Sequence, residues 1–498
     1  MNKYGNRASD KATSISGLES DYARTTALGT FQLSAAEVLG LVLGFGISVI
    51  LTRRLGPALY GLYSVAVTVV LWIELGIHYM FHQATIKFLA EASDWQKTAS
   101  ALVQAGLLVG LAAAALLAMS APILAAWLKA QELVLYLRLL ALDIPLYALA
   151  SGHKSTLIGR SAFAKGALPG IWYWSARLLL VIMFTGLGLS APGALLAIVG
   201  SSAVQFIVTR FFIRPALLKR ASFPLRPILG YALPLFLHGT SLRVLTRLDL
   251  LLVQGLGGTA AVAGYYGAAQ NLAIVTLGTL ASSLSSPLLS TVTKLRQAGQ
   301  EDAAREMTAQ ALRLLLCLLP FAALVAGAST EIVQLAYGDF FSPAAPLLSW
   351  LIFGGVALLI LSVCSALLVA AGKPGVTLIL TSPLLPLAVA GHCLLIPRYG
   401  SIGAAAVTTV VLGLAALGGV LGACRFWEVH PPLGSAVRSS AISVLAYIVA
   451  AFWSTPGFLL VGKLLVIGAA ILLAFLLLGG FSAREFALLR SLFTSPRQ

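Results

Sequence analysis

The sequence predicts an all-α protein that crosses a membrane many times. Of its 498 residues, 59% are hydrophobic and only 10% are charged, and the mean hydropathy is +0.94. A soluble domain carries about 25% charged residues, so this chain has too little polar surface to cover domains of its size in water. The third observation is a series of apolar runs, each long enough for the roughly 20-residue helix that spans a bilayer.

We predict fourteen spanning helices, joined by loops too short to hold a soluble catalytic domain. The first is weakened by Glu37, the seventh by several charges, and the thirteenth by its shortness. The approximate spans are 30–52, 59–83, 99–120, 133–156, 164–187, 193–213, 229–254, 262–288, 310–328, 346–371, 375–396, 401–424, 437–454 and 459–480.

The Lys and Arg residues between these helices indicate the orientation, because cytoplasmic loops carry an excess of both. With the N-terminus in the cytoplasm, 24 of the 33 cations lie on that side. Most of the net charge of +16 therefore marks topology, and both termini are expected in the cytoplasm. No basic patch alternates with aromatic residues, which argues against nucleic acid as a partner. The outside cations are Arg53, Arg54, Lys129, Arg398 and Lys463.

An internal repeat relates the two halves of the chain. Residues 51–57 and 60–66 resemble residues 252–258 and 263–269. Both copies contain an apolar helix, a Leu-Gly turn, and then a Gly-x-Tyr-x-x-Ala motif that opens the next helix. Six predicted helices separate the copies, an even number, so the repeats run parallel in the membrane. Such repeats are typical of transporters with two lobes related by an axis along the membrane normal.

Several segments resemble, in their order and spacing, the bacterial polysaccharide transporters. These are the Wzx-like lipid-linked oligosaccharide flippases of the multidrug/oligosaccharidyl-lipid/polysaccharide exporter superfamily. The resemblance covers roughly residues 30–425. Its segments are RRLGPALYGLYS (53–64), LPLF (233–236), RLDLLLV (247–253), VAGYYGAAQ (262–270), IVQLAYGDF (332–340) and IGAAA (402–406).

The resemblance implies twelve core helices in two lobes around a central cavity. It also implies alternating access that flips an undecaprenyl-diphosphate-linked oligosaccharide across the bacterial inner membrane for O-antigen, exopolysaccharide or capsule biosynthesis. The implied partners are the lipid-linked oligosaccharide, membrane lipids, and polysaccharide polymerase and chain-length proteins. The chain departs from this pattern by carrying helices 13 and 14, which resemble the extra pair of the lipid II flippase branch.

The expected organisation follows from the repeat and the extra helices. We assign 1–28 to a cytoplasmic N-terminal tail and 29–225 to an N-lobe of helices 1–6. Residues 226–426 form a C-lobe of helices 7–12, and 427–498 form helices 13–14 and a cytoplasmic tail.

Four arginines within the spans are candidates to bind the diphosphate and glycan. A charge at mid-membrane costs about 2.5–3.5 kcal/mol on insertion scales, so it normally faces a partner or a wet cavity. Guanidinium groups stay charged and bind phosphate oxygens bidentately. The alternative is structural: Arg138 would pair with Glu74 or Asp143 or reach the outer surface, and Arg243 or Arg247 would pair with Asp249. The four candidates are Arg177, Arg243, Arg247 and Arg138.

Four acids within the spans are candidates to couple transport to an ion gradient by binding H⁺ or Na⁺. The alternative role for each is a salt bridge between helices. We expect no cofactor besides the coupling ion and no catalytic or metal site. Tyr173 and Trp174 share a helix face with Arg177, where they are candidates to stack on a sugar. The four acids are Asp249, Glu37, Glu74 and Asp143.

Other functions are weighed against the flippase. A lipid II flippase for peptidoglycan and a multidrug/cation antiporter would share the same lobes. An integral-membrane polysaccharide polymerase or glycosyltransferase would need catalytic acids outside, where the loops offer little beyond Glu132, Glu331 and Asp339. The chain has no P-loop pattern, which argues against ATP hydrolysis. We therefore predict a transporter rather than an enzyme.

Overall fold

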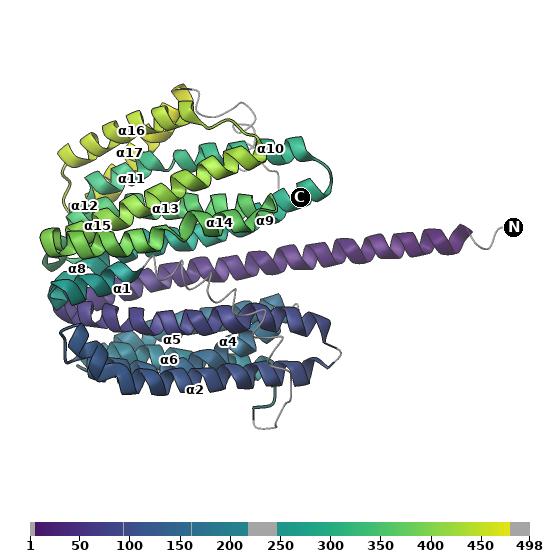
Figure 1. The fold of residues 1–498 in the computed structure, drawn as a ribbon, viewed down its shortest axis with the longest axis horizontal. Helices are drawn as coiled ribbons and strands as arrows, with labels where there is room; N and C mark the ends of the chain where they lie inside the picture. Colours follow the sequence, from purple (N-terminus) through teal and green to yellow (C-terminus); the bar gives the residue numbers. More distant parts are fainter. Residues whose placement is uncertain (1–4, 93, 161, 218–246, 479–498) are drawn as a thin grey trace. The chain divides into compact units, whose positions relative to one another are not determined.

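The computed structural model describes residues 5–92, 94–160, 162–217 and 247–478, and every regular element in this part of the chain is helical (Figure 1). Eleven of these helices are long and apolar enough to cross a membrane. The prediction of an all-α, multi-pass membrane protein is confirmed.

Two of the eleven helical stretches are long enough for two crossings each. They cover Ala35–Leu89 and Pro374–Trp427. Each contains one non-helical glycine, Gly56 (φ 69°) in the first and Gly400 (φ 60°) in the second. Glycine enters this left-handed region without the penalty that a Cβ imposes, so the chain turns there and the next crossing begins. The described helices thus account for thirteen predicted spans; the seventh, 229–254, lies mostly outside the described residues.

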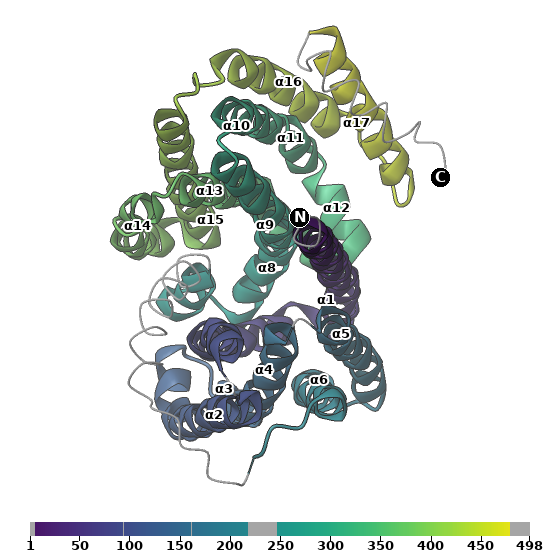
Figure 2. The same cartoon turned by 90° about the vertical axis from the view of Figure 1, so that its right-hand side faces the viewer.

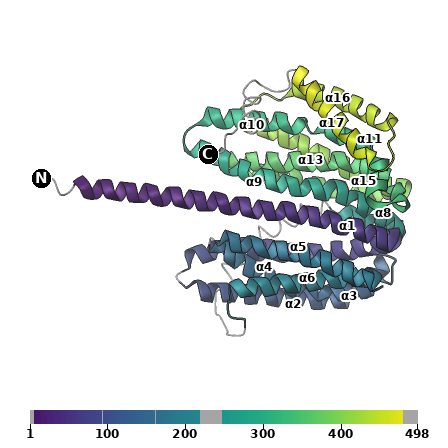
Figure 3. The same cartoon turned by 180° about the vertical axis from the view of Figure 1, so that it is seen from behind.

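The chain divides into two compact units by its internal contacts. The first is formed by the described parts of 1–54 and 62–244, and the second by those of 55–61 and 245–498. The first unit contains α2 (Trp95–Trp127), α3 (Leu133–Ala141), α4 (Asp143–Gly159), α5 (Phe163–Gly186), α6 (Ser190–Phe212) and most of α1 (Gly5–Glu91). Within it, α6 packs against α4 and α5, and α2 packs against α3 and α4 (Figure 3).

The second unit is built around one fully apolar helix. This is α13 (Ala345–Ala370), which carries no charged residue and packs against helices on several sides. An apolar helix can face either lipid or protein, and most residues of α13 are buried inside the protein. Its neighbours include α8 (Ala260–Gln270), η1 (Asn271–Val275), α9 (Thr276–Gln297), α10 (Glu301–Leu316), α11 (Leu319–Gly327), α12 (Ser329–Tyr337), η2 (Asp339–Ala344), α14 (Pro374–Thr381) and α15 (Leu384–Trp427).

The last two described helices, α16 (Leu433–Phe452) and α17 (Leu459–Leu477), pack against α11 at the edge of the second unit (Figure 2). Their contact is mostly apolar, but it contains one ion pair. Lys463, counted above among the loop cations, lies inside α17 with 1% of its surface exposed. Its Nζ donates to Oε1 of Glu331 on α12 at 2.7 Å. The partner neutralises a charge that would otherwise be costly in a spanning helix.

Candidate functional site

Arg177 is held on α5 by aromatic side chains. Its Nη2 donates to the hydroxyl of Tyr63 on α1 at 2.8 Å, and its Nη1 donates to the hydroxyl of Tyr173 at 3.2 Å. The guanidinium carbon lies 5.5 Å from the ring centroid of Trp174 and 5.9 Å from that of Tyr173. Cation–π contacts of this kind attract the charge without neutralising it.

The Arg177 guanidinium keeps capacity for a further ligand. Its Nε is buried and has no hydrogen-bond partner in the part of the chain that the structure describes. A guanidinium has five N–H donors in a planar fork, and the two phenols are neutral acceptors. Trp174 closes the side toward α1, where a Cβ added to Gly40 would lie 2.5 Å from the indole Nε1. The two aromatic residues considered as sugar-stacking groups thus lie against Arg177 itself.

A pair of carboxyl groups lies beside Arg177. Glu74 on α1 is 9% exposed and Asp143 on α4 is 1% exposed, and the two side chains are close enough to act on each other electrostatically. Ser202 on α6 approaches Asp143 as well. Among the described residues, the buried Oε1 of Glu74 and Oδ1 of Asp143 have no hydrogen-bond partner. Two neighbouring carboxylates repel each other while both are ionised, so this arrangement is suited to holding a proton.

The cation that acts on this acid pair differs from the predicted one. The charge of Arg177 acts on both carboxyl groups. Arg138, the partner expected for Glu74 or Asp143, is exposed in the last turn of α3. Arg138 and Asp143 are five residues apart, not the three or four that place two side chains on the same helix face.

In the second unit, Asp249 is surrounded by hydrogen-bond donors. It is 0% exposed. Its Oδ1 accepts from the backbone N–H of Leu250 and from Nε2 of Gln270, both at 2.8 Å. Its Oδ2 accepts from the hydroxyls of Tyr266 at 2.6 Å and Thr408 at 2.8 Å. These four donors occupy the roughly four lone-pair sites of a carboxylate.

Arg247 reaches Asp249 only through an intermediate side chain. Its Nη1 donates to Oε1 of Gln270 at 3.1 Å, and the amide of Gln270 then donates to Asp249. The side chain of Gln270 therefore bridges Arg247 and Asp249, for which the sequence suggested a direct salt bridge. The charge of Asp249 acts on the buried imidazole of His392 on α15, whose Nδ1 has no hydrogen-bond partner among the described residues.

The remaining predicted residues lie elsewhere. Glu37 is exposed on α1, where its charge acts on Lys154 of α4. Arg243 lies outside the described residues. The structure therefore brings Arg177, Glu74 and Asp143 together in the first unit, and it brings Arg247 close to Asp249 in the second.

Two tyrosines that the charge pattern did not single out complete these clusters. Tyr63 binds Arg177, and Tyr266 binds Asp249. Both occupy the Tyr position of the repeated Gly-x-Tyr-x-x-Ala motif. The repeat was the signal that could have found them. The other partners, Gln270, Thr408 and Ser202, are uncharged and carry no comparable signal in the sequence.

Ionisable residues that are buried among membrane-spanning helices are typical of proteins that move ions or polar substrates through the bilayer. The comparisons with known proteins agree with this class of membrane transport proteins. The sequence pattern of the family described as "Polysaccharide biosynthesis protein" matches residues 50–346. This is more than half of the chain, and the chain belongs to that family. No curated protein is significantly similar to it in sequence.

Solved structures show which fold the chain has. The lipid II flippase MurJ in its inward closed conformation aligns with a TM-score of 0.75 and 17% identity, covering 91% of this chain and 99% of MurJ. An inward-facing multidrug resistance MATE family transporter of the MOP superfamily aligns with a TM-score of 0.57 and 18% identity, covering 84% and 99%. A eukaryotic MATE transporter aligns with a TM-score of 0.54 and 14% identity, covering 85% and 99%. The chain shares its fold with these transporters.

Proposed function

We propose that this protein is a flippase that moves an undecaprenyl-diphosphate-linked oligosaccharide across the bacterial inner membrane for surface polysaccharide biosynthesis. Membership of the polysaccharide biosynthesis family and the fold shared with a lipid II flippase support this proposal. Both termini would lie in the cytoplasm, and alternating access would expose the cargo site first to that side and then to the outer side. The polyprenyl tail would remain in the lipid.

The observation that carries the proposal is the guanidinium of Arg177. It donates hydrogen bonds to two neutral phenols, and no described residue accepts from its buried Nε. A diphosphate is a dianion that must cross a region of low dielectric. Charge-assisted bonds between guanidinium and phosphate are about twice as strong as neutral hydrogen bonds. Arg177 therefore keeps an N–H donor that can bind a phosphate oxygen of the diphosphate.

Replacing Arg177 tests this function. We expect Arg177→Ala to lower glycan export at least tenfold, because about 1.5–3 kcal/mol of a charged hydrogen bond is lost. Arg177→Lys should retain part of the export, since a lysine keeps the charge but not the planar fork. Arg214→Ala, at an exposed arginine of the same unit that is not a candidate for cargo binding, is the matched control and should export normally. Export is measured by surface glycan at equal protein level. Full export by Arg177→Ala contradicts the proposed site.

The neighbouring acid pair supports H⁺ as the coupling ion. When the Glu74–Asp143 pair holds a proton, less negative charge stands beside Arg177, and the guanidinium binds an anion more strongly. When the pair loses that proton, the carboxylates compete with the diphosphate for Arg177. Proton binding from outside and cargo binding from inside would then be linked through one arginine. Na⁺ is the alternative ion.

The coupling proposal predicts a pH dependence that the pair controls. Diphosphate binding to the purified protein should weaken as the pH rises, since deprotonation of the pair adds negative charge beside Arg177. In the double variant Glu74→Gln with Asp143→Asn, binding should stay strong and become nearly independent of pH. Glu37→Gln, which changes an exposed acid of the same unit, should preserve the wild-type profile. Isothermal titration with a soluble diphosphate at several pH values measures this. If the double variant keeps the wild-type pH profile, the coupling ion does not bind at the Glu74–Asp143 pair.

A lipid II flippase for peptidoglycan is the second candidate. The alignment with MurJ covers 91% of this chain, including a region beyond twelve helices. Rescue of cells depleted of their lipid II flippase would favour this cargo. If the protein instead restores only surface polysaccharide in cells that lack their own oligosaccharide flippase, the first candidate function is favoured. Arg177 would bind a diphosphate in either case.

A further inference from the structure

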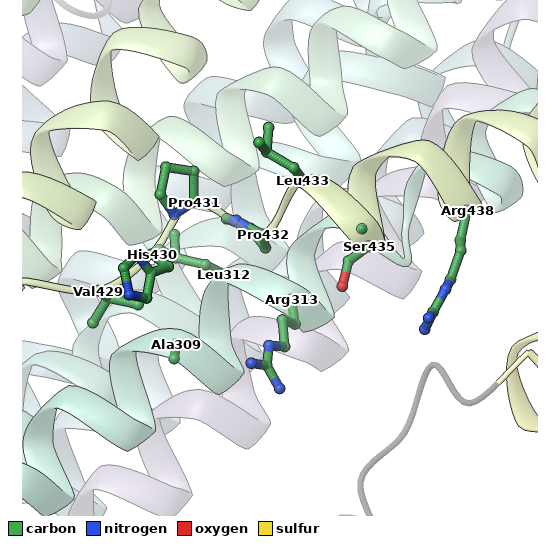
Figure 4. A pocket seen from close by; sticks show the side chains of 11 residues that line it. Ala309, Leu312, Arg313, Val429, His430, Pro431, Pro432, Leu433, Ser435 and Arg438 are labelled. Atoms are coloured by element: carbon green, nitrogen blue, oxygen red, sulfur yellow. The ribbon is translucent and has the colours of Figure 1, made fainter.

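A basic cavity of about 350 Å³ lies in the second unit, apart from the charged clusters described above. It is open on one side and is lined by α10, by the connection between α15 and α16, and by the start of α16 (Figure 4). Its polar side chains are two arginines, a histidine and a serine. The residues that matter for the argument are Leu312 and Arg313 of α10, His430 of the connection, and Ser435 and Arg438 of α16.

The wall of this cavity is rigid. Helix α15 ends at Trp427, whose indole Nε1 donates to the carbonyl of Leu367 at 3.0 Å, and the next residue, Glu428, is left-handed (φ 53°). Pro431 and Pro432 then lead directly into α16. Each proline fixes its φ near −65°, so the connection has little freedom and the cavity is formed in advance.

The cavity carries positive charge. The side chains of Arg313 and Arg438 extend toward the same side of it (Figure 4). None of the described residues that line it is acidic. The adjacent carboxylate, Glu428, is paired with Arg305 at 2.7 Å. The cavity therefore presents the side chains of two arginines, and the described carboxylate next to it is already paired.

The cavity also lies at the start of a predicted membrane-spanning helix. It borders the first turn of α16, whose predicted span begins at 437. Leu433 and Val437 are each 70% exposed and lie four residues apart, on one face of the helix. The loop cations assign this end of the helix to the cytoplasmic side. Basic pockets between spanning helices on that side are suited to lipid headgroups.

We propose that this cavity binds the phosphate of an anionic phospholipid headgroup, with the acyl chains lying along Leu433 and Val437. Arg313 and Arg438 would hold the phosphate, and Ser435 would donate to one of its oxygens. The proposal rests on the basic cavity and its apolar border, and it is independent of the cargo that the protein moves.

The test measures lipid binding to the full chain in detergent. The probes are mixed micelles that contain cardiolipin, phosphatidylglycerol or phosphatidylcholine, and the readouts are bound lipid by native mass spectrometry and the thermal unfolding temperature. The variant is Arg313→Gln with Arg438→Gln. The control is Arg214→Gln with Arg425→Gln, which removes the same charge from exposed arginines outside the cavity.

We expect the anionic lipids to bind and to raise the unfolding temperature of the wild type and of the control. The cavity variant should bind them about tenfold more weakly or worse, because each basic residue near the surface contributes about 1 kcal/mol. A charge-preserving Arg313→Lys, Arg438→Lys variant should keep most of the binding, which shows that the chain folds without the arginines. If the cavity variant and the control bind the anionic lipids equally well, the proposed lipid site is wrong. Stabilisation by inorganic phosphate alone, to the same extent, overturns the lipid as its ligand.

Discussion

Replacing Gly61 with alanine is expected to lower the stability of the second unit by about 3 kcal/mol, at the upper end of the usual cost of overpacking. A Cβ at Gly61 would overlap the carbonyl oxygen of Ala260 and would lie 2.7 Å from the backbone nitrogen of Gly264. A Cβ at Gly264 would in turn overlap the carbonyl oxygen of Pro57. These neighbours are backbone atoms, so no flexible side chain can move aside, and the two segments would have to separate.

The measurement is the thermal unfolding temperature in detergent, together with the yield of monodisperse protein. Gly46→Ala is the matched control, because a Cβ there meets nothing within 4 Å. In a helix, this change should be neutral or favourable by about 0.5–1 kcal/mol. Unfolding of Gly61→Ala at the same temperature as Gly46→Ala would contradict the close contact.

The position of Gly61 shows what the sequence can and cannot predict. Gly61 and Gly264 are equivalent glycines of the internal repeat, and the repeat is visible in the sequence. That the two copies pack backbone to backbone is not visible, since no pattern within one copy indicates its partner. The apolar runs predicted the spanning helices because length and composition alone decide whether a helix suits a bilayer.

The sequence singled out the charged members of the candidate site and, by their spacing from Arg177, Tyr173 and Trp174. Arg177, Glu74 and Asp143 stood out because charges are scarce in the spans. Their grouping depends on how α1, α4 and α5 face one another, which periodicity in apolar helices does not determine. Lys463 was missed for a related reason: at the edge of a span, a buried cation and a loop cation look alike until its partner Glu331 is known.

Replacing Asp249 with alanine is expected to cost about 3 kcal/mol or more. Four donors, from Leu250, Gln270, Tyr266 and Thr408, would lose their acceptor in a fully buried place. Each buried group left without a partner costs about 1–3 kcal/mol. The same unfolding assay measures the loss. Asp302→Asn, at an exposed acid of the same unit, is the control and should leave the unfolding temperature unchanged.

Asp249→Asn separates the structural role of this carboxylate from ion coupling. An asparagine keeps one acceptor oxygen for Leu250 and Gln270, and the hydroxyls of Tyr266 and Thr408 can rotate to accept from its amide. This variant should therefore be much more stable than Asp249→Ala. Because protein donors occupy all the lone pairs of Asp249, we expect Asp249→Asn to keep both export and its pH dependence. Loss of export by a stable Asp249→Asn protein would instead place the coupling ion in the second unit, and the unpartnered Nδ1 of His392 would be the next group to test.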